Sequence, residues 1–217
     1  MFKFVIIEDE LMISEMLAEF IEKTMPGYHC AGQAIRIDAG IKLCHRIRPG
    51  LVLIDIHLHG ADGIVAAQSL TRELPETSII LISADCSPYN CYRIVQSGIR
   101  GFVDKTRPLA ELKHAIKHVM TGESWFPDSF ETLRREYGRD PNAFFKILST
   151  REQEIMLHIV DDNTDEEIAK ALDISPRTAE THRYNITKKL GLSDSSALRK
   201  YATEHGMWLP NKTGNPT

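Results

Sequence analysis

Short apolar runs and longer amphipathic segments alternate along the first 121 residues, and this alternation limits the possible folds more than any other feature. Five runs have the length and the β-branched and aromatic content of buried strands: residues 2–7, 28–33, 51–55, 78–83 and 101–105. In the segments that follow them, apolar residues recur at helical spacing. Regular alternation of strand and helix predicts an α/β fold, a doubly wound five-stranded parallel sheet with helices on both faces.

Beyond Ser149 every patterned segment has the helical period. We expect four helices, at residues 150–160, 165–172, 176–190 and 195–205. Ser149 and Thr164 each precede a glutamate by three positions, the spacing of a capping box, and Ser175 precedes a proline, as at many helix starts. The second part of the chain is therefore predicted to be an all-α four-helix domain.

This change of pattern divides the chain into two domains. A length of 217 residues suits two modest domains, and 42% apolar residues suffice for a core in each. We place the first domain at residues 1–121, a linker at residues 122–148 and the second domain at residues 149–217. Helical signals around residues 129–137 indicate a short helix within the linker.

The apolar N-terminal run MFKFVII continues directly into Glu8, Asp9 and Glu10. It is too short and too acidic at its end for a signal peptide or a membrane span, and no other uncharged run approaches spanning length. The four cysteines show neither CxxC nor metal-finger spacing, which favours free thiols. We therefore expect a cytoplasmic protein without a membrane partner.

Polar side chains stand at the carboxyl ends of four predicted strands. Glu8 and Asp9 follow the first strand, and Asp55 ends the third, directly after four apolar residues. Ser83 and Lys105 end the fourth and fifth strands. In a doubly wound sheet these ends lie at one edge, where ligands bind. Three carboxylates there would repel one another unless a cation neutralised them, and hard oxygen ligands of this kind suit Mg²⁺.

The lysine and the hydroxyl provide the charge and the hydrogen-bond donor that an incoming phosphoryl group needs. In such surroundings Asp55 can act as a nucleophile that accepts phosphate. Two other interpretations are open for individual residues. Glu8 and Asp9 alone could cap the following helix, and His57 and His59 could bind zinc, although no further ligand spacing supports zinc.

The segments IIEDE, LVLIDIHLHGADG, LISAD and GFVDK closely resemble, in order and spacing, those of response-regulator receiver domains. This resemblance implies that Asp55 is the phospho-acceptor. It also implies that Glu8 and Asp9 hold Mg²⁺ together with Asp55 and the backbone carbonyl of His57. The sequence departs from the family where Glu8 replaces the more usual aspartate.

The same resemblance assigns roles to three residues of the last two strands. Ser83 and Lys105 would contact the phosphoryl oxygens, and Ser83 and Phe102 would form the hydroxyl and aromatic switch. The expected phosphodonor is a histidine kinase or a small phosphorylated molecule.

Charge in the second domain gives two opposed indications about nucleic acid. Residues 149–217 carry nine Lys and Arg against eleven Asp and Glu, so their overall charge argues against it. Within the helix predicted at residues 176–190, however, four basic residues meet a single acid: Arg177, Arg183, Lys188 and Lys189. A local basic stripe supplies phosphate contacts. This helix and the one before it, joined by a short turn, predict a helix-turn-helix whose second helix enters the major groove.

The segments LSTREQEIMLHIV, TDEEIAKALDISPRTAETHRYNITKKLGL and SSALRKYA resemble the LuxR-type helix-turn-helix. With the receiver, this makes the NarL/FixJ class of response regulators. The resemblance implies binding to double-stranded DNA, with bases contacted by Glu180, Thr181 and Tyr184. It assigns phosphate contacts to four further residues: Arg177, Thr178, Asn185 and Lys188.

The expected function is a transcriptional regulator in which phosphorylation of Asp55 controls dimerisation and DNA binding. The helix after Ser193, with Leu198 and Tyr201, is a candidate contact between two copies. No enzymatic activity is expected beyond accepting phosphate and slow self-dephosphorylation. Two alternatives are a magnesium-dependent aspartyl phosphatase, which would need a second aspartate where His57 stands, and an adaptor that works without phosphorylation.

Overall fold

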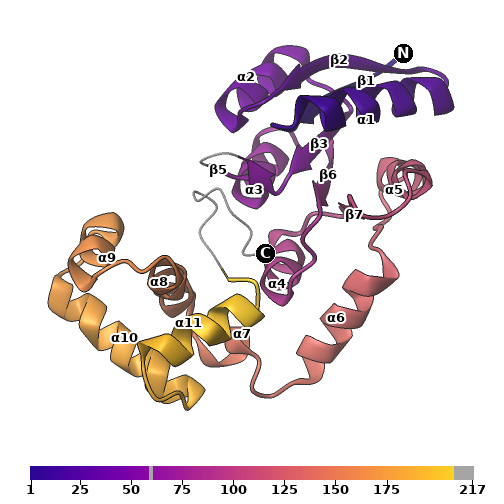
Figure 1. Cartoon of the computed structure of the whole chain (residues 1–217). Helices are drawn as coiled ribbons and strands as arrows, with labels where there is room; N and C mark the ends of the chain where they lie inside the picture. Colours follow the sequence, from indigo (N-terminus) through magenta and orange to yellow (C-terminus); the bar gives the residue numbers. More distant parts are fainter. Residues whose placement is uncertain (59–60, 208–217) are drawn as a thin grey trace. The chain divides into compact units, whose positions relative to one another are not determined.

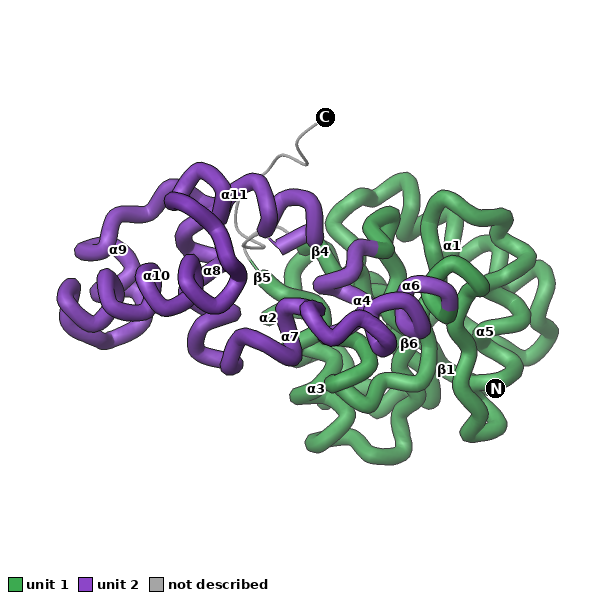
Figure 2. Tube along the Cα trace, turned by 90° about the horizontal axis from the view of Figure 1, so that it is seen from below, with its two compact units in different colours: residues 1–86, 93–131, 210–217 green, residues 87–92, 132–209 purple. Residues whose placement is uncertain are grey.

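The computed structural model of the chain describes residues 1–58 and 61–207 and divides them into two compact units. One unit contains residues 1–58, 61–86 and 93–131, and the other contains residues 87–92 and 132–207 (Figure 2). Each unit has its own cluster of buried apolar side chains, so each forms a body of its own.

A parallel sheet runs through the first unit (Figure 1). Among the described residues its strands are β1 (Phe2–Ile7), β2 (Tyr28–Ala34), β3 (Leu51–Asp55), β6 (Ser78–Ser83) and β7 (Gly101–Asp104). They are ordered β2-β1-β3-β6-β7, and each neighbouring pair is parallel. The strand order changes direction between β1 and β3, as in a doubly wound sheet, which confirms the predicted fold class.

Helices cover both faces of this sheet. On one face lie α1 (Leu11–Thr24) and α5 (Ala110–Met120), which share a core with the strands. On the other face α2 (Ile37–Ile47) contacts β1 and β2, and α3 (Gly63–Glu73) contacts β3 and β6. A further helix, α4 (Pro88–Ser97), begins among the residues of the second unit and ends among those of the first.

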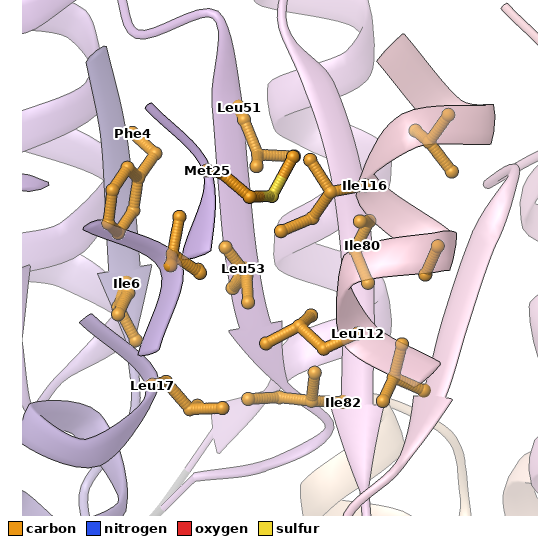
Figure 3. Close-up of a cluster of buried hydrophobic side chains, with 14 of the residues drawn as sticks. Phe4, Ile6, Leu17, Met25, Leu51, Leu53, Ile80, Ile82, Leu112 and Ile116 are labelled. Carbon is orange, nitrogen blue, oxygen red and sulfur yellow. The ribbon is translucent and has the colours of Figure 1, made fainter. Parts of the chain in front are cut away.

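Alternate strand residues fill the core beneath α1 and α5 (Figure 3). Phe4 and Ile6 of β1 point into it together with Leu53 of β3, and all three are fully buried. Val5 and Ile7, which alternate with them, are buried as completely. Because successive side chains of a strand point to opposite faces, both faces of the sheet are covered. This burial on two sides explains why the strands are uninterrupted apolar runs rather than alternating ones.

A small hairpin after β3 was not predicted. β4 (His57–Leu58) and β5 (Ala61–Asp62) pair antiparallel, with His57 opposite Asp62. His59 and Gly60 lie outside the described residues. The alternative of a zinc site formed by His57 and His59 therefore also lies outside them. Strands of two residues carry no periodic signal, which is why sequence patterning missed them.

Between residues 122 and 148, all of them described, the chain forms two helices rather than one. The helix predicted around residues 129–137 is present as α6 (Asp128–Arg139), and α7 (Phe144–Ile147) adds a single turn. Just before α6, Trp125 pairs with Gly101 of β7 in an isolated parallel bridge. The start of the linker is therefore bonded to the edge of the sheet.

The helices of the second unit agree with the predicted ones to within one residue. They are α8 (Thr150–Val160), α9 (Asp165–Leu172), α10 (Pro176–Leu190) and α11 (Ser195–Glu204). Both predicted capping boxes form, at Ser149 and at Thr164, and the hydroxyl of Ser175 accepts a hydrogen bond from the N–H of Thr178. Local signals thus determined where these helices begin.

The second core corrects the predicted contact between two copies. Ile155, Ile186 and Leu198 are fully buried together beneath these helices. Leu198 therefore cannot offer an exposed surface to a partner, and that part of the prediction is wrong. Tyr201 is half-buried and stacks on the ring of His205, 4.0 Å away. The apolar spacing of α11 reflects packing within its own domain.

Truncation of Ile116 should destabilise the first unit strongly. Its side chain is fully buried between α5 and the sheet, so Ile116→Ala leaves a cavity and should lower the free energy of unfolding by about 2–5 kcal/mol. Urea denaturation measures the change. The neighbouring Lys117→Ala removes an exposed side chain and should shift it by less than about 0.5 kcal/mol. Equal losses in both variants would contradict the packing described here.

Candidate functional site

The sheet register brings Glu8 and Asp55 to the same level. β1 and β3 are parallel neighbours with Ile7 opposite Ile54, and an acid follows each of these two residues along the chain. This place lies between β1 and β3, where the strand order changes direction. The predicted convergence of acids at one edge of the sheet is therefore seen in the structure.

Ser83 and Lys105 reach the same edge from β6 and β7. The register pairs Ser83 with Asp104, and the N–H of Lys105 donates to the carbonyl of Ser83 at 2.8 Å. Asp55 is opposite Ile82, the residue before Ser83. The hydroxyl and the ammonium therefore come from the two strands that continue the sheet on the side of Asp55.

Glu8, Asp9 and Asp55 form a cluster of carboxylates. One oxygen of each lies within 4.8 Å of those of the others. Glu8 and Asp55 are buried, at 0% and 4% exposure, and Asp9 is half-buried. Taking negative charges of this proximity out of water is costly without a neutralising partner.

Lys105 provides part of that neutralisation. Its Nζ lies 2.9 Å from Oδ2 of Asp55 and 2.8 Å from Oε2 of Glu8. The lysine side chain itself is only 14% exposed, so these ion pairs are poorly screened by solvent. One ammonium group thus bridges two buried carboxylates that leave adjacent strands.

The charge balance is visible in the pKa values of these groups. Burial raises the pKa of Glu8 from its ordinary 4.5 to about 7, and Asp55 adds to this rise while Lys105 opposes it. Burial likewise raises the pKa of Asp55, against the effect of Lys105. Burial acts to lower the pKa of Lys105, but the two carboxylates outweigh it and raise that pKa. The lysine therefore stays charged, and the acids still lack positive charge.

The acidic cluster fits a small divalent cation. Oε2 of Glu8 is buried and accepts no well-directed hydrogen bond from any described residue, although the Lys105 ammonium is close. Carboxylate oxygens that converge in this way are the ligands that Mg²⁺ takes, with water and phosphate oxygens completing its shell. Such a cation would relieve the repulsion that the single lysine leaves.

Two loops face each other beside Asp55. Oδ1 of Asp55 accepts from the N–H of His57 at 3.3 Å, and Oγ of Ser83 accepts from the N–H of Asp85 at 3.0 Å. The His57 ring and the Asp85 carboxylate then meet at 3.3 Å across the loops. The residues two positions beyond Asp55 and Ser83 are thus in contact, which was not predicted.

Gly63 is required by the tight turn after Asp55. A Cβ atom at this position would lie 1.9 Å from the carbonyl oxygen of Asp55, closer than any side chain tolerates. The N–H of Gly63 donates to the carbonyl of Ile56 at 3.0 Å. The start of α3 is therefore packed directly against the backbone of the candidate phospho-acceptor.

Asp62 and Arg93 form a pair that sequence patterning missed. Oδ1 of Asp62 caps α3 by accepting from the N–H groups of Ile64 and Val65, and Oδ2 contacts the guanidinium of Arg93 on α4. The aspartate before the helix was a recognisable capping signal. Its partner lies 31 residues away, and no local pattern announces such a pairing.

In the second unit, α10 presents one buried and one exposed face. Ala179 and Ile186 are fully buried, as the helical spacing predicted. The residues predicted to contact bases, Glu180, Thr181 and Tyr184, are all exposed. Tyr184 is 65% exposed, so its ring is accessible to a partner.

The residues predicted to contact phosphates differ in how exposed they are. Arg177 and Lys188 are exposed, whereas Thr178 and Asn185 are half-buried. The hydroxyl of Thr178 also lies 2.8 Å from that of Ser175 within the helix cap. Arg177 and Lys188 are therefore the more accessible cations of this set.

The basic stripe predicted on α10 is reduced, because two of its four basic residues form ion pairs within the domain. Arg183 pairs with Asp165 at 2.9 Å, and Lys189 pairs with Glu152 at 2.8 Å. These pairs link α10 to the first turns of α9 and α8. Two of the four basic side chains thus hold the helices together, and their charge is largely balanced within the domain.

Comparisons with known proteins cover both parts of the chain. Residues 4–117 match the family described as the response regulator receiver domain. Residues 146–202 match the family described as bacterial regulatory proteins of the luxR family. The two matches lie in the order in which the sequence resemblances were found.

Relatives of known role are similar over nearly the whole chain. The transcriptional regulatory protein MctR of Rhizobium johnstonii is 32% identical over 206 residues, covering 93% of this chain and 93% of its own. The transcriptional regulatory protein LiaR of Bacillus subtilis is 30% identical over 205 residues, covering 93% of this chain and 97% of its own.

Solved structures share the fold of the chain. One is RcsB of Salmonella enterica serovar Typhimurium, bound to the promoter rprA with a phosphomimetic, with a TM-score of 0.68, 21% identity and coverage of 92% of this chain and 97% of its own. Another RcsB structure has a TM-score of 0.64, 22% identity and coverage of 94% and 100%. Within the described part of the chain, no helix is long and apolar enough to cross a membrane.

The buried Glu8 should make stability depend on pH. Its folded-state pKa of about 7 exceeds the ordinary 4.5, so the stabilising proton is fully bound below pH 4.5 and is lost as the pH rises through about 7. Without divalent cations, the free energy of unfolding of the wild type relative to Glu8→Gln should therefore fall from acidic to mildly alkaline pH.

Urea denaturation at about pH 5 and about pH 8 measures this difference in the free energy of unfolding, because the two values lie on either side of the raised pKa of Glu8. Glu10→Gln, at an exposed neighbouring position, is the matched control and should follow the wild type at both values. A pH dependence that is the same in Glu8→Gln and the wild type would contradict the assignment.

Proposed function

This chain belongs to the response regulators that join a receiver domain to a LuxR-type DNA-binding domain, and we propose that phosphorylation of Asp55 controls its dimerisation and its binding to DNA. The family consists of transcriptional regulators rather than classical enzymes. We assign residues 1–121 to the receiver, residues 122–148 to the linker and residues 149–217 to the DNA-binding domain. A regulator of this kind acts on the chromosome, and we therefore place it in the cytoplasm.

One observation supports this proposal most directly. Asp55 is a buried carboxylate beside Glu8 and Asp9, with the Lys105 ammonium 2.9 Å from its Oδ2. A carboxylate of the sheet core, placed at the strand ends between acids and a lysine, has the surroundings that phosphoryl transfer requires.

Transfer to Asp55 begins with its carboxylate oxygen as nucleophile. A P–N bond of a histidine kinase, or a P–O bond of a small phosphodonor, breaks as an O–P bond to Asp55 forms. The Lys105 ammonium can then move its contact from the carboxylate to a phosphoryl oxygen, and the Ser83 hydroxyl can donate to another. The leaving group departs with the electron pair of the broken bond.

A magnesium ion fits the acidic cluster, where Glu8, Asp9, Asp55 and the backbone carbonyl of His57 would hold it. Bound there, it would supply the positive charge that the reacting oxygens need. Lys105 alone neutralises less than the site contains, because it faces both Glu8 and Asp55. Hydrolysis of the phosphorylated Asp55 by water would be slow self-dephosphorylation, and we propose no other catalysis.

Phosphorylation adds a charge of about −1.5 to −2 beside Ser83 and Lys105. These groups are drawn toward it, and Phe102 on β7, fully buried, responds to the movement of Ser83. We propose that this shift favours a dimer whose two DNA-binding domains reach half-sites about one helical turn apart. RcsB, which shares the fold, has been seen as dimers bound to DNA.

On DNA, α10 would enter the major groove as the second helix of the helix-turn-helix. Glu180, Thr181 and Tyr184 would face base edges, where a carboxylate can accept from the amine of cytosine. Phosphates would be contacted by the remaining residues of the predicted set: Arg177, Thr178, Asn185 and Lys188.

Asp55→Asn should abolish phosphate uptake. The wild type, incubated with Mg²⁺ and acetyl phosphate, should gain the mass of one phosphoryl group, because Asp55 is the nucleophile of the site. Intact-mass spectrometry measures the gain. Asp38→Asn, an exposed aspartate on α2, is the control and should behave as the wild type. An equal gain in Asp55→Asn would refute the assignment.

Lys188→Ala and Glu180→Ala should separate contacts to phosphates from contacts to bases. Removing Lys188 should weaken binding to specific and random duplexes alike and lower the salt slope by about one unit. Removing Glu180 should cost about 1–3 kcal/mol on the specific duplex only, because a base contact is lost. Loss of its negative charge should instead strengthen binding to random DNA.

Binding titrations at several salt concentrations measure both effects. Lys117→Ala removes an exposed lysine from α5, in the receiver, and should leave the salt slope unchanged. If Glu180→Ala weakens binding to both duplexes equally, Glu180 supports the fold of α10 and does not read DNA.

A further inference from the structure

The linker contacts the switch aromatic of the receiver directly. The ring of Phe130, in the first turn of α6, lies 5.4 Å from the ring of Phe102 at an angle of 37°. Both side chains are 0% exposed. Phe126 in turn stacks on Phe130, with the ring centroids 4.6 Å apart at 15°. Phe102 is therefore enclosed by a residue of the linker and not by the receiver alone.

The same stretch is bonded to the backbone of β7. The N–H of Phe102 donates to the carbonyl of Trp125 at 3.0 Å, and the N–H of Trp125 donates to the carbonyl of Arg100 at 2.8 Å. The Trp125 ring packs against His114 and His118 of α5. Residues 125–130, here called the anchor segment, thus add one bridge of sheet beside the strand that carries Phe102.

A third contact reaches the loop after Ser83. The side chain of Ser129 lies close enough to the Cys86 thiol to act against the rise in pKa that burial causes there. Cys86 follows Asp85, whose N–H donates to the Ser83 hydroxyl at 3.0 Å. The anchor segment is therefore in contact with both elements of the proposed switch, the loop of Ser83 and the ring of Phe102.

We propose that the anchor segment senses the phosphorylation state of the receiver, with Phe130 as the positioning residue that holds the ring of Phe102. This inference rests on the proposed function of Asp55. In a closely packed interior a buried ring cannot change position unless its neighbours give way. A movement of Phe102 that follows Ser83 must therefore displace Phe130 or take it along.

Covering the free edge of β7 would not by itself require this arrangement. Pairing of its backbone groups protects an edge, and Trp125 pairs with Arg100 and Phe102 through its own backbone. The ring of Phe130 is not part of this backbone pairing, and it packs on the ring of Phe102. The ring contact therefore couples Phe102 to the linker in a way that protection of the edge does not require.

The anchor segment leads directly into the second unit. α6 runs without interruption from Asp128 to Arg139, and its residues from 132 onward belong to that unit. A change at Phe130 thus acts on the first turn of a continuous helix. Because coupling between two sites is reciprocal, the linker must also influence how readily the receiver adopts its phosphorylated state.

Trp125 provides a reporter within the anchor segment. In a Trp208→Phe background it is the single tryptophan of the chain. Beryllofluoride with Mg²⁺, a mimic of the phosphorylated state, should change its fluorescence emission, because Trp125 is bonded to Phe102. Phe130→Leu should reduce this change and should lower the gain in DNA affinity caused by beryllofluoride by about fivefold or more.

Phe4→Leu is the matched control, since it replaces an equally buried ring on β1, which β3 and β6 separate from β7. It should reduce stability but leave both responses intact. Phe130→Met, which keeps an apolar side chain of similar length, replaces Phe130→Leu if that variant does not fold. Intact-mass measurement of phosphate uptake accompanies each variant.

The outcomes separate this inference from its premise. A wild type that takes up no phosphate refutes the role of Asp55 and the inference with it. A wild type that takes up phosphate without any change in Trp125 emission overturns the inference alone. The same holds if Phe130→Leu retains both the emission change and the gain in DNA affinity of the wild type.

Discussion

Repulsion between buried carboxylates is the constraint on which the receiver half of this molecule depends. Glu8 and Asp55 leave adjacent parallel strands at the same level, and neither is accessible enough for water to stabilise its charge. Lys105 reaches both from the last strand, so the site is complete only when β7 is in register with β6. Gly63 then allows the chain to turn tightly past Asp55. Burial first and the Asp55 charge second raise the pKa of Glu8, and a Mg²⁺ ion would supply the positive charge that Lys105 alone does not.

Charge is used in a second way in the DNA-binding half. Arg183 and Lys189 are basic residues of α10, but they pair with acids at the starts of neighbouring helices. Carboxylates near helix N-termini are already favoured by the helix dipole, so these pairs reinforce the packing of α10. Arg177 and Lys188 stay on the exposed face. A domain with a net negative charge can therefore still carry exposed cations on α10, while Arg183 and Lys189 pair with two of its acids.

The linker is part of the structure of both units rather than a tether. Trp125 and Phe130 belong to the first unit, where they lie against β7 and Phe102. Phe144, in the single turn of α7, is fully buried in the core of the second. Both ends of the linker are thus held by apolar packing, and α6 connects them. This arrangement gives a conformational change in the receiver a physical route along the chain.

Local sequence determined the strands, the main helices and their caps, because hydrophobic periodicity and capping residues act over a few positions. It also indicated the acids of the site, since a carboxylate such as Asp55 that ends an apolar strand needs a partner. Contacts between distant residues were decided only by the tertiary structure. The pairing of Arg93 with Asp62, the ring contact of Phe130 with Phe102 and the burial of Leu198 depend on sheet register and helix packing. No spacing within the sequence contains that information, because it arises only when separate elements are brought together.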